Sequence, residues 1–216
     1  MTSFSISNKR RILEIAAVIV TAIGKFIFMD WLAWRFLFVA IAILSWAIYI
    51  MYRSRKQPGI LRYWGFRTDN FKKVVKMILP FGFFSLIAFA GIGFYQGTIN
   101  ITWHIIPILI LYPIWGIIQQ FLLIALTAGN MQELKGYNLN KLLIILIAAL
   151  LFALVHYPYT WLIIGTFILA ILYGFIYLKE RNIYVLGIFH GWLGGLFYYT
   201  VVDRDPLLEM FGKFIR

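Results

Sequence analysis

The sequence predicts an all-α membrane protein, a polytopic bundle of about seven transmembrane helices with an additional basic helix at the membrane interface. Two observations lead to this prediction. Of the 216 residues, 62% are hydrophobic and only 13% are charged, whereas an ordinary soluble domain has about a quarter charged residues. Apolar runs close to the ~20 residues that a helix needs to cross a bilayer recur along the chain. We therefore expect residues 1–216 to form a single membrane domain.

Seven apolar stretches give the expected spans. They are Ile12–Met29, Trp31–Tyr52, Met77–Tyr95, Ile101–Leu126, Leu142–Tyr157, Thr160–Leu178 and Ile183–Val202. A basic cluster, Lys9 to Arg11, precedes the first stretch, as in a secretory signal peptide. Because no small-residue cleavage site follows and the second stretch begins at once, we interpret the first stretch as a retained helix.

Basic residues gather in alternate connections between these spans. Fifteen of the 20 Lys and Arg residues precede the first span or lie in the connections 53–76, 127–141 and 179–182, and the intervening connections 96–100 and 158–159 contain none. By the positive-inside rule, we expect the amino terminus and the basic connections to be cytoplasmic. The expected location is the bacterial cytoplasmic membrane. The net charge of +12 is therefore expected to interact with the lipid bilayer. The same placement argues against binding to nucleic acid.

The connection before the third span contains the expected interfacial helix. Residues 68–70, Thr-Asp-Asn, offer an N-cap. The apolar residues that follow share one helical face, and the lysines lie elsewhere around the turn: Phe71, Val74, Val75 and Ile78 against Lys72, Lys73 and Lys76. We expect this helix to lie against anionic lipid and to run into the third span.

Two further charged segments flank the expected outer surface. Lys25 and Arg35 each lie five residues from Asp30, at the tip of the first helical hairpin. We expect both side chains to extend to the membrane surface around this acid. The segment Leu207–Arg216 is expected to lie on the outer interface.

Three polar motifs interrupt the later spans. Gln119 and Gln120 lie in the fourth span, His156 closes Phe152-x-x-x-His156 in the fifth, and His190 lies in the seventh. Polar groups inside a membrane are costly and often mark functional sites. Each motif alone also has a structural explanation, since buried amides and imidazoles can hydrogen-bond neighbouring helices.

Taken together, the motifs resemble those of the CAAX protease and bacteriocin-processing family, also called the CPBP or Abi family of intramembrane endopeptidases. The family motifs run Glu-Glu-x-x-x-Arg, Phe-x-x-x-His and His-x-x-x-Asn or Asp, on three membrane helices in that order. Here they read Gln119-Gln120-x-x-x-Ile124, Phe152-x-x-x-His156 and His190-x-x-x-Gly194. The segment 63–71 also resembles a stretch that precedes a core helix in many members. The resemblance covers about residues 60–200, the expected CPBP-like core.

The resemblance implies a catalytic site at Gln119, Gln120, His156 and His190, with an altered chemistry. In the family, the first glutamate is thought to activate a water, and the histidines hold or orient the water, a metal ion or the oxyanion. Glutamine cannot act as a base, and none of the eight acidic residues lies within the third to seventh expected spans. We therefore expect weak or no proteolysis and no cofactor. Zinc or another divalent metal is expected only if the protein is an active protease.

Three functions remain open at this point. The first is a pseudoenzyme that binds a membrane-associated or lipidated peptide, or that regulates a partner membrane protein. The second is an active intramembrane endopeptidase that uses Gln119, His156 and His190. The third is a small transporter or channel, which needs a continuous polar path. For the first two, we expect Gln119 or Gln120, His156 and His190 to face one interior cavity.

A glycine stripe marks the last expected span. Gly187, Gly191 and Gly195 recur every four residues, with Gly194 beside them. Such a stripe lets another helix backbone come close. We expect it to serve packing inside the bundle rather than dimerisation.

Overall fold

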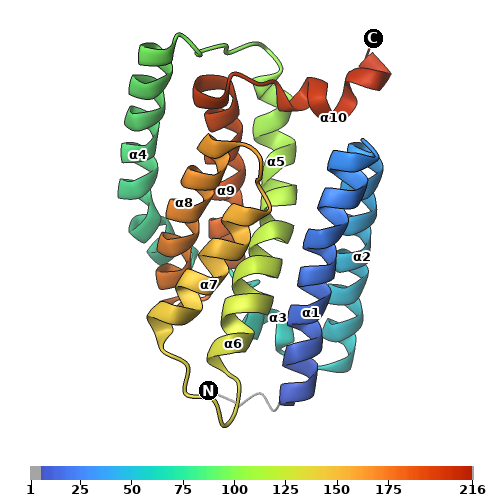
Figure 1. The fold of residues 1–216 in the computed structure, drawn as a ribbon. Coiled ribbons are helices and arrows are strands. Elements are labelled where there is room, and N and C mark those ends of the chain that lie inside the picture. The colour runs from blue at the N-terminus through green and yellow to red at the C-terminus, as the bar shows by residue number, and fades with distance from the viewer. Residues whose placement is uncertain (1–5, 216) are drawn as a thin grey trace.

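The protein is a helical bundle in the computed structural model, which describes residues 6–215 (Figure 1). The α-helices are α1 (Asn8–Gly24), α2 (Arg35–Lys56), α3 (Ile60–Trp64), α4 (Phe71–Gln96), α5 (Ile105–Gln120), α6 (Asn130–Gln132), α7 (Lys141–Leu154), α8 (Thr160–Lys179), α9 (Ile183–Phe197) and α10 (Pro206–Ile215). Wider π-helical turns continue three of them: η1 (Lys25–Trp31), η2 (Phe121–Gly129) and η3 (Tyr198–Val202). Since this range contains no strand, the all-α prediction is confirmed.

Six of the seven predicted spans are confirmed as helices long and apolar enough to cross a membrane. They are Asn8–Trp31, Arg35–Lys56, Phe71–Gln96, Ile105–Gln132, Thr160–Lys179 and Ile183–Val202. The prediction of Leu142–Tyr157 as a span was too long. α7 has 14 residues, about 21 Å at 1.5 Å per residue, against a hydrocarbon core of ~30 Å. It stops early because Pro158 disfavours a helical conformation at the residue before it.

The helices alternate in direction, so their ends meet at two faces (Figure 1). We call one the basic face: it contains the start of α1 and the connections 57–70, 133–140 and 180–182. We call the other the far face: it contains the connections 32–34, 97–104 and 155–159 and the helix α10. In Figure 1, α10 lies across the far face, toward the ends of α1 and α2. Leu207–Arg216 was predicted to lie at this surface; Arg216 itself is outside the described residues.

The glycine stripe packs α9 against α5. A Cβ atom added to Gly187 would lie 2.4 Å from the Cα of Ile117, and one added to Gly191 would lie 2.5 Å from the nitrogen of Pro113. Such distances leave no room for a methyl group. The prediction that the stripe serves packing inside the bundle is therefore confirmed. Gly194 differs, because a Cβ there would meet nothing within 4 Å.

The basic amphipathic segment is not a separate interfacial helix; it forms the first two turns of α4. Val74 and Ile78 are fully buried, while Lys72, Lys73 and Lys76 are exposed, as the pattern predicts. The segment stays in line with the span because its apolar side packs on the bundle rather than on lipid. The interfacial prediction is corrected accordingly.

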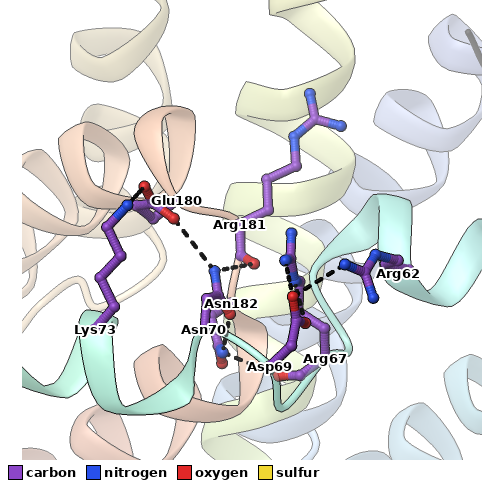
Figure 2. A network of polar contacts seen from close by, with 8 residues as sticks. All are labelled: Arg62, Arg67, Asp69, Asn70, Lys73, Glu180, Arg181 and Asn182. Carbon is purple, nitrogen blue, oxygen red and sulfur yellow. Dashed lines mark hydrogen bonds and ion pairs between the residues drawn. The ribbon is translucent and has the colours of Figure 1, made fainter. Parts of the chain in front are cut away.

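Asn70 is the N-cap residue of α4, but its side chain makes no capping hydrogen bond. Its side chain faces the turn between α8 and α9 instead, as Figure 2 shows. There the Nδ2 of the buried Asn182 donates to the Oδ1 of Asn70 (2.7 Å) and to the carbonyl oxygen of Arg67 (2.9 Å). The Oδ1 of Asn182 accepts from the backbone N–H of Val185 and so caps α9. One asparagine therefore joins the starts of α4 and α9.

Ion pairs surround this junction (Figure 2). Lys73 pairs with Glu180, and Asp69 pairs with Arg62 and Arg67. The hydrogen bond from Arg67 lowers the pKa of Asp69 to about 2, and the one from Lys73 lowers the pKa of Glu180. Lowered carboxyl pKa values stabilise the folded state above the ordinary pKa, and this contribution is lost as the pH falls through the folded value. The junction is therefore fully ionised at neutral pH.

Replacing Asn182 with alanine should lower the stability of the bundle by about 1–3 kcal/mol. The change removes a helix cap and leaves the Oδ1 of the buried Asn70 without its hydrogen-bond donor. The matched control is Asn140→Ala, which removes the exposed cap of α7 and one hydrogen bond. Thermal unfolding in detergent compares the two. An equal loss in both variants would show that the buried junction adds nothing beyond the cap.

A buried ion cluster fastens α1 and α2 to the bundle near the basic face. Glu14, 3% exposed, receives hydrogen bonds from Arg53 (2.5 Å), Tyr49 (2.5 Å) and Asn130 of α6 (2.7 Å). Arg11 in turn donates to the Oδ1 of Asn130 (3.1 Å). Because both oxygens of Glu14 have partners, its charge is accommodated inside the bundle.

Candidate functional site

A cavity of about 910 Å³ lies between the α1–α2 hairpin and the helices α4, α5, α7, α8 and α9. Its walls are mainly aliphatic and aromatic, with Phe38, Phe89 and Trp115 among them. Both the volume and the lining are typical of sites that bind small organic ligands. The polar side chains at its inner end are Gln119, His156 and His190, together with Thr127.

Gln119 and His190 form one polar pair across the α5–α9 contact. The Nε2 of His190 lies 2.9 Å from the Oε1 of Gln119. The two residues meet because Gly116 and Gly187, each three positions earlier in its helix, bring the backbones together: a Cβ at Gly116 would lie 2.4 Å from the carbonyl oxygen of Gly187. The glycine stripe therefore sets the geometry of the site.

His156 reaches the same end of the cavity just beyond the end of α7. Its Nδ1 donates to the carbonyl oxygen of Phe152 (2.7 Å), and its ring meets the Phe152 ring edge-on at 4.9 Å between centroids. The Phe152 ring also lies 5.4 Å from the ring of His190. The phenylalanine of the second motif thus packs against both histidines.

These contacts define which hydrogen bonds remain for a ligand. A carbonyl oxygen only accepts, so the Nδ1 of His156 holds the proton and its Nε2 is left as an acceptor. When the Nε2 of His190 donates to the Oε1 of Gln119, the amide nitrogen of Gln119 keeps two donors. The inner end of the cavity can therefore bind a group that both donates and accepts, such as a peptide amide.

Gln120 is not part of this arrangement. It is 0% exposed, it does not line the cavity, and neither polar atom of its amide has a hydrogen-bond partner among the described residues. Consecutive residues of a helix point about 100° apart, and here Gln119 faces the cavity while Gln120 points away from it. Of the four predicted site residues, the structure brings together Gln119, His156 and His190.

The donors at this site do not fit a catalytic zinc ion. Such an ion takes three protein ligands from histidine, cysteine or carboxylate side chains, whereas two imidazoles and one amide are present here. Within residues 6–215, no three His, Asp or Glu side chains form a group that could hold a metal ion.

Charged residues line the rim of the cavity toward the far face. Lys25 pairs with Asp30 (2.6 Å), as predicted. Arg35, also expected beside Asp30, binds Glu209 of α10 instead (2.9 Å). Arg204 pairs with the same carboxylate. Glu209 is the one acidic residue among the described residues that line the cavity, and both guanidinium groups engage it.

The match to a known family covers the three motifs. A family model described as "Rce1-like: Type II CAAX prenyl endopeptidase Rce1-like" matches residues 93–195, from the end of α4 to α9. The segment that contains Gln119, His156 and His190 is thus Rce1-like, and the predicted resemblance to the CAAX protease family is confirmed. No curated protein and no solved structure matches the chain. Residues 93–195 are thus similar to a CAAX prenyl endopeptidase family, and together with the six long apolar helices this similarity indicates an integral membrane protein.

Proposed function

We propose that the protein binds a membrane-associated or lipidated peptide in the cavity and does not hydrolyse it efficiently. One observation supports this most directly. The cavity retains Gln119, His156 and His190 as hydrogen-bonding groups, but the position of the family's water-activating carboxylate is a glutamine. The apolar walls suit a lipid chain or an apolar segment, and the three polar groups suit an amide.

Hydrolysis needs more than these groups offer. Water becomes a nucleophile at neutral pH through a general base or a metal ion. The imidazole acceptors in position are the Nε2 of His156 and, when the Nε2 of His190 donates to Gln119, the Nδ1 of His190. The imidazolium that either would form has no carboxylate beside it. Glu209 is engaged by Arg35 and Arg204 at the rim. General base catalysis is worth about 10²–10⁴-fold, so its loss leaves a feeble enzyme.

The purified protein is expected to leave prenylated and unmodified peptides intact and to hold no stoichiometric zinc. A peptide library incubated with the protein in detergent and in vesicles tests the first point by mass spectrometry, and elemental analysis tests the second. Robust cleavage that His156→Ala abolishes would instead establish an active endopeptidase.

The charge asymmetry supports a membrane orientation for this function. With the basic face in the cytoplasm of a bacterial cell, reporter fusions after Lys56 and after Gly97 should give opposite signals. Matching signals would contradict both the orientation and the number of spans. A transporter finds no support here, because the cavity lining does not extend to the connections of the basic face.

A further inference from the structure

The cavity occupies the half of the bundle nearer the far face. Among its deepest residues toward the basic face, Thr127 lies five positions before the end of α6, His190 lies seven positions into α9, and Phe81 and Leu151 lie ten positions into α4 and α7. At 1.5 Å per residue, the floor is about 8–15 Å from the basic ends of these helices. The floor therefore lies about a quarter to a half of the way through a hydrocarbon core of ~30 Å, measured from the basic face.

Packed side chains lie beside and below this floor. Phe121 and Ile124 of η2 are completely buried, and the ring of Phe121 packs on Trp64 with 5.0 Å between centroids. The ion cluster of Glu14 and Arg53 lies nearby on the same side. A ligand therefore has no open route to Gln119 and His190 from the basic face.

The walls above the floor are as deep as one membrane leaflet. Along α5 the lining runs from Gln119 to Ile108, eleven residues and about 16 Å. This equals about half of the ~30 Å hydrocarbon core. A single lipid chain lying parallel to those of the leaflet fits such a space.

Helix α10 roofs the cavity. Glu209 and Phe211 line it from above. Glu209 is bonded to Arg35 of α2, and the Phe211 ring packs on Phe36, 5.5 Å between centroids. The side chains of Arg35 and Glu209 are 29% and 25% exposed, so their ion pair remains accessible at the rim. Surface-accessible ion pairs of this kind contribute about 1 kcal/mol or less to stability. The pair between Arg35 and Glu209 can therefore break at little cost and let α10 move away from the cavity.

We infer that the ligand is a single-chain amphiphile of the leaflet at the far face, and that it enters beneath α10. The nature of the ligand in this inference rests on the proposed function. The entrance itself follows from the depth of the floor, the closed packing beneath it and the ion pair that holds the roof. A lipid-anchored peptide and a free single-chain lipid share the required chemistry, an apolar chain with a polar end.

Because the chain contains no cysteine, single cysteines can report the entrance without a ligand. Gly194→Cys lines the cavity and meets no neighbouring atom within 4 Å. Ser85→Cys, on the α4 wall, is a second probe of nearly unchanged size. Gln96→Cys and Lys72→Cys mark the far and basic faces. A membrane-impermeant, charged methanethiosulfonate is added to sealed vesicles of each orientation.

Both cavity cysteines are expected to react from the side that labels Gln96→Cys. Glu209→Gln, which weakens the pair with Arg35, should speed their labelling severalfold, whereas the control Asp69→Asn at the basic face should not. Labelling from the Lys72→Cys side, or from neither side, would overturn the inference. So would a Glu209→Gln variant with an unchanged rate.

Protection identifies the ligand. A farnesylated peptide and a lysophospholipid are each added before the reagent. Slower labelling with the peptide alone favours a lipid-anchored peptide, and slower labelling with both favours any single-chain amphiphile. If neither compound slows the labelling of the cavity cysteines, but the reagent still reaches them from the far face, the proposed function is wrong and the inferred entrance beneath α10 is upheld.

Discussion

A Gly191→Ala variant is expected to lose about 3 kcal/mol or more of stability, the upper end of the cost of overpacking a core. The added methyl group would lie 2.5 Å from the backbone nitrogen of Pro113, and a backbone atom cannot rotate away as a side chain can. The two helices must separate, which also pulls His190 from Gln119. We therefore expect ligand binding to be lost together with stability, measured by thermal unfolding and peptide binding in detergent.

Gly194→Ala is the matched control. It lies in the same helix and adds the same methyl group, but into open space. Alanine is favoured over glycine in a helix by up to ~1 kcal/mol, so this variant should be as stable as the natural protein or more so. Equal losses in the two variants would contradict the close α5–α9 packing.

Removing Arg53 alone is expected to cost about 3–5 kcal/mol, because it leaves the buried Glu14 charge without its main partner. Arg53→Met tests this by unfolding in detergent. The double variant Glu14→Leu/Arg53→Met removes both charges and should lose clearly less than the sum of the two single losses.

An exposed pair provides the control for this prediction. Lys73, 61% exposed, pairs with Glu180 at the basic face, and surface pairs contribute about 0–1 kcal/mol. Lys73→Ala should therefore be nearly neutral. Strict additivity of the Glu14 and Arg53 substitutions would show that the two charges are not coupled.

Local patterns in the sequence predict most of the fold. Apolar runs locate six of the spans, and the spacing of Val74 and Ile78 gives the buried side of α4. The same patterns do not reveal whether that side meets lipid or protein, which is why α4 was expected to begin with an interfacial helix. Hydropathy also fails to give the end of α7. The apolar run continues through Val155 and Tyr157, whereas the helix ends earlier because of Pro158.

The candidate site is predicted in part. Motif order leads to Gln119, His156 and His190, and the glycine stripe leads to the close approach that joins two of them. Gln120 lies outside the site because of the way α5 is rotated about its axis. The sequence of a single helix does not define this rotation. Arg35 was expected beside Asp30 because they are neighbours in the chain. Its actual partner, Glu209, comes from α10, which packs across the far face 174 residues later.

Equilibrium binding of a fluorescent farnesylated peptide to the protein in lipid nanodiscs, followed by mass spectrometry of the recovered peptide, tests the central claim. We expect saturable binding, a recovered peptide of unchanged mass, and affinity lowered about tenfold by Gln119→Leu, as loss of one buried hydrogen bond implies. Absence of saturable binding, or a peptide recovered cleaved, would contradict a cavity that binds without hydrolysis.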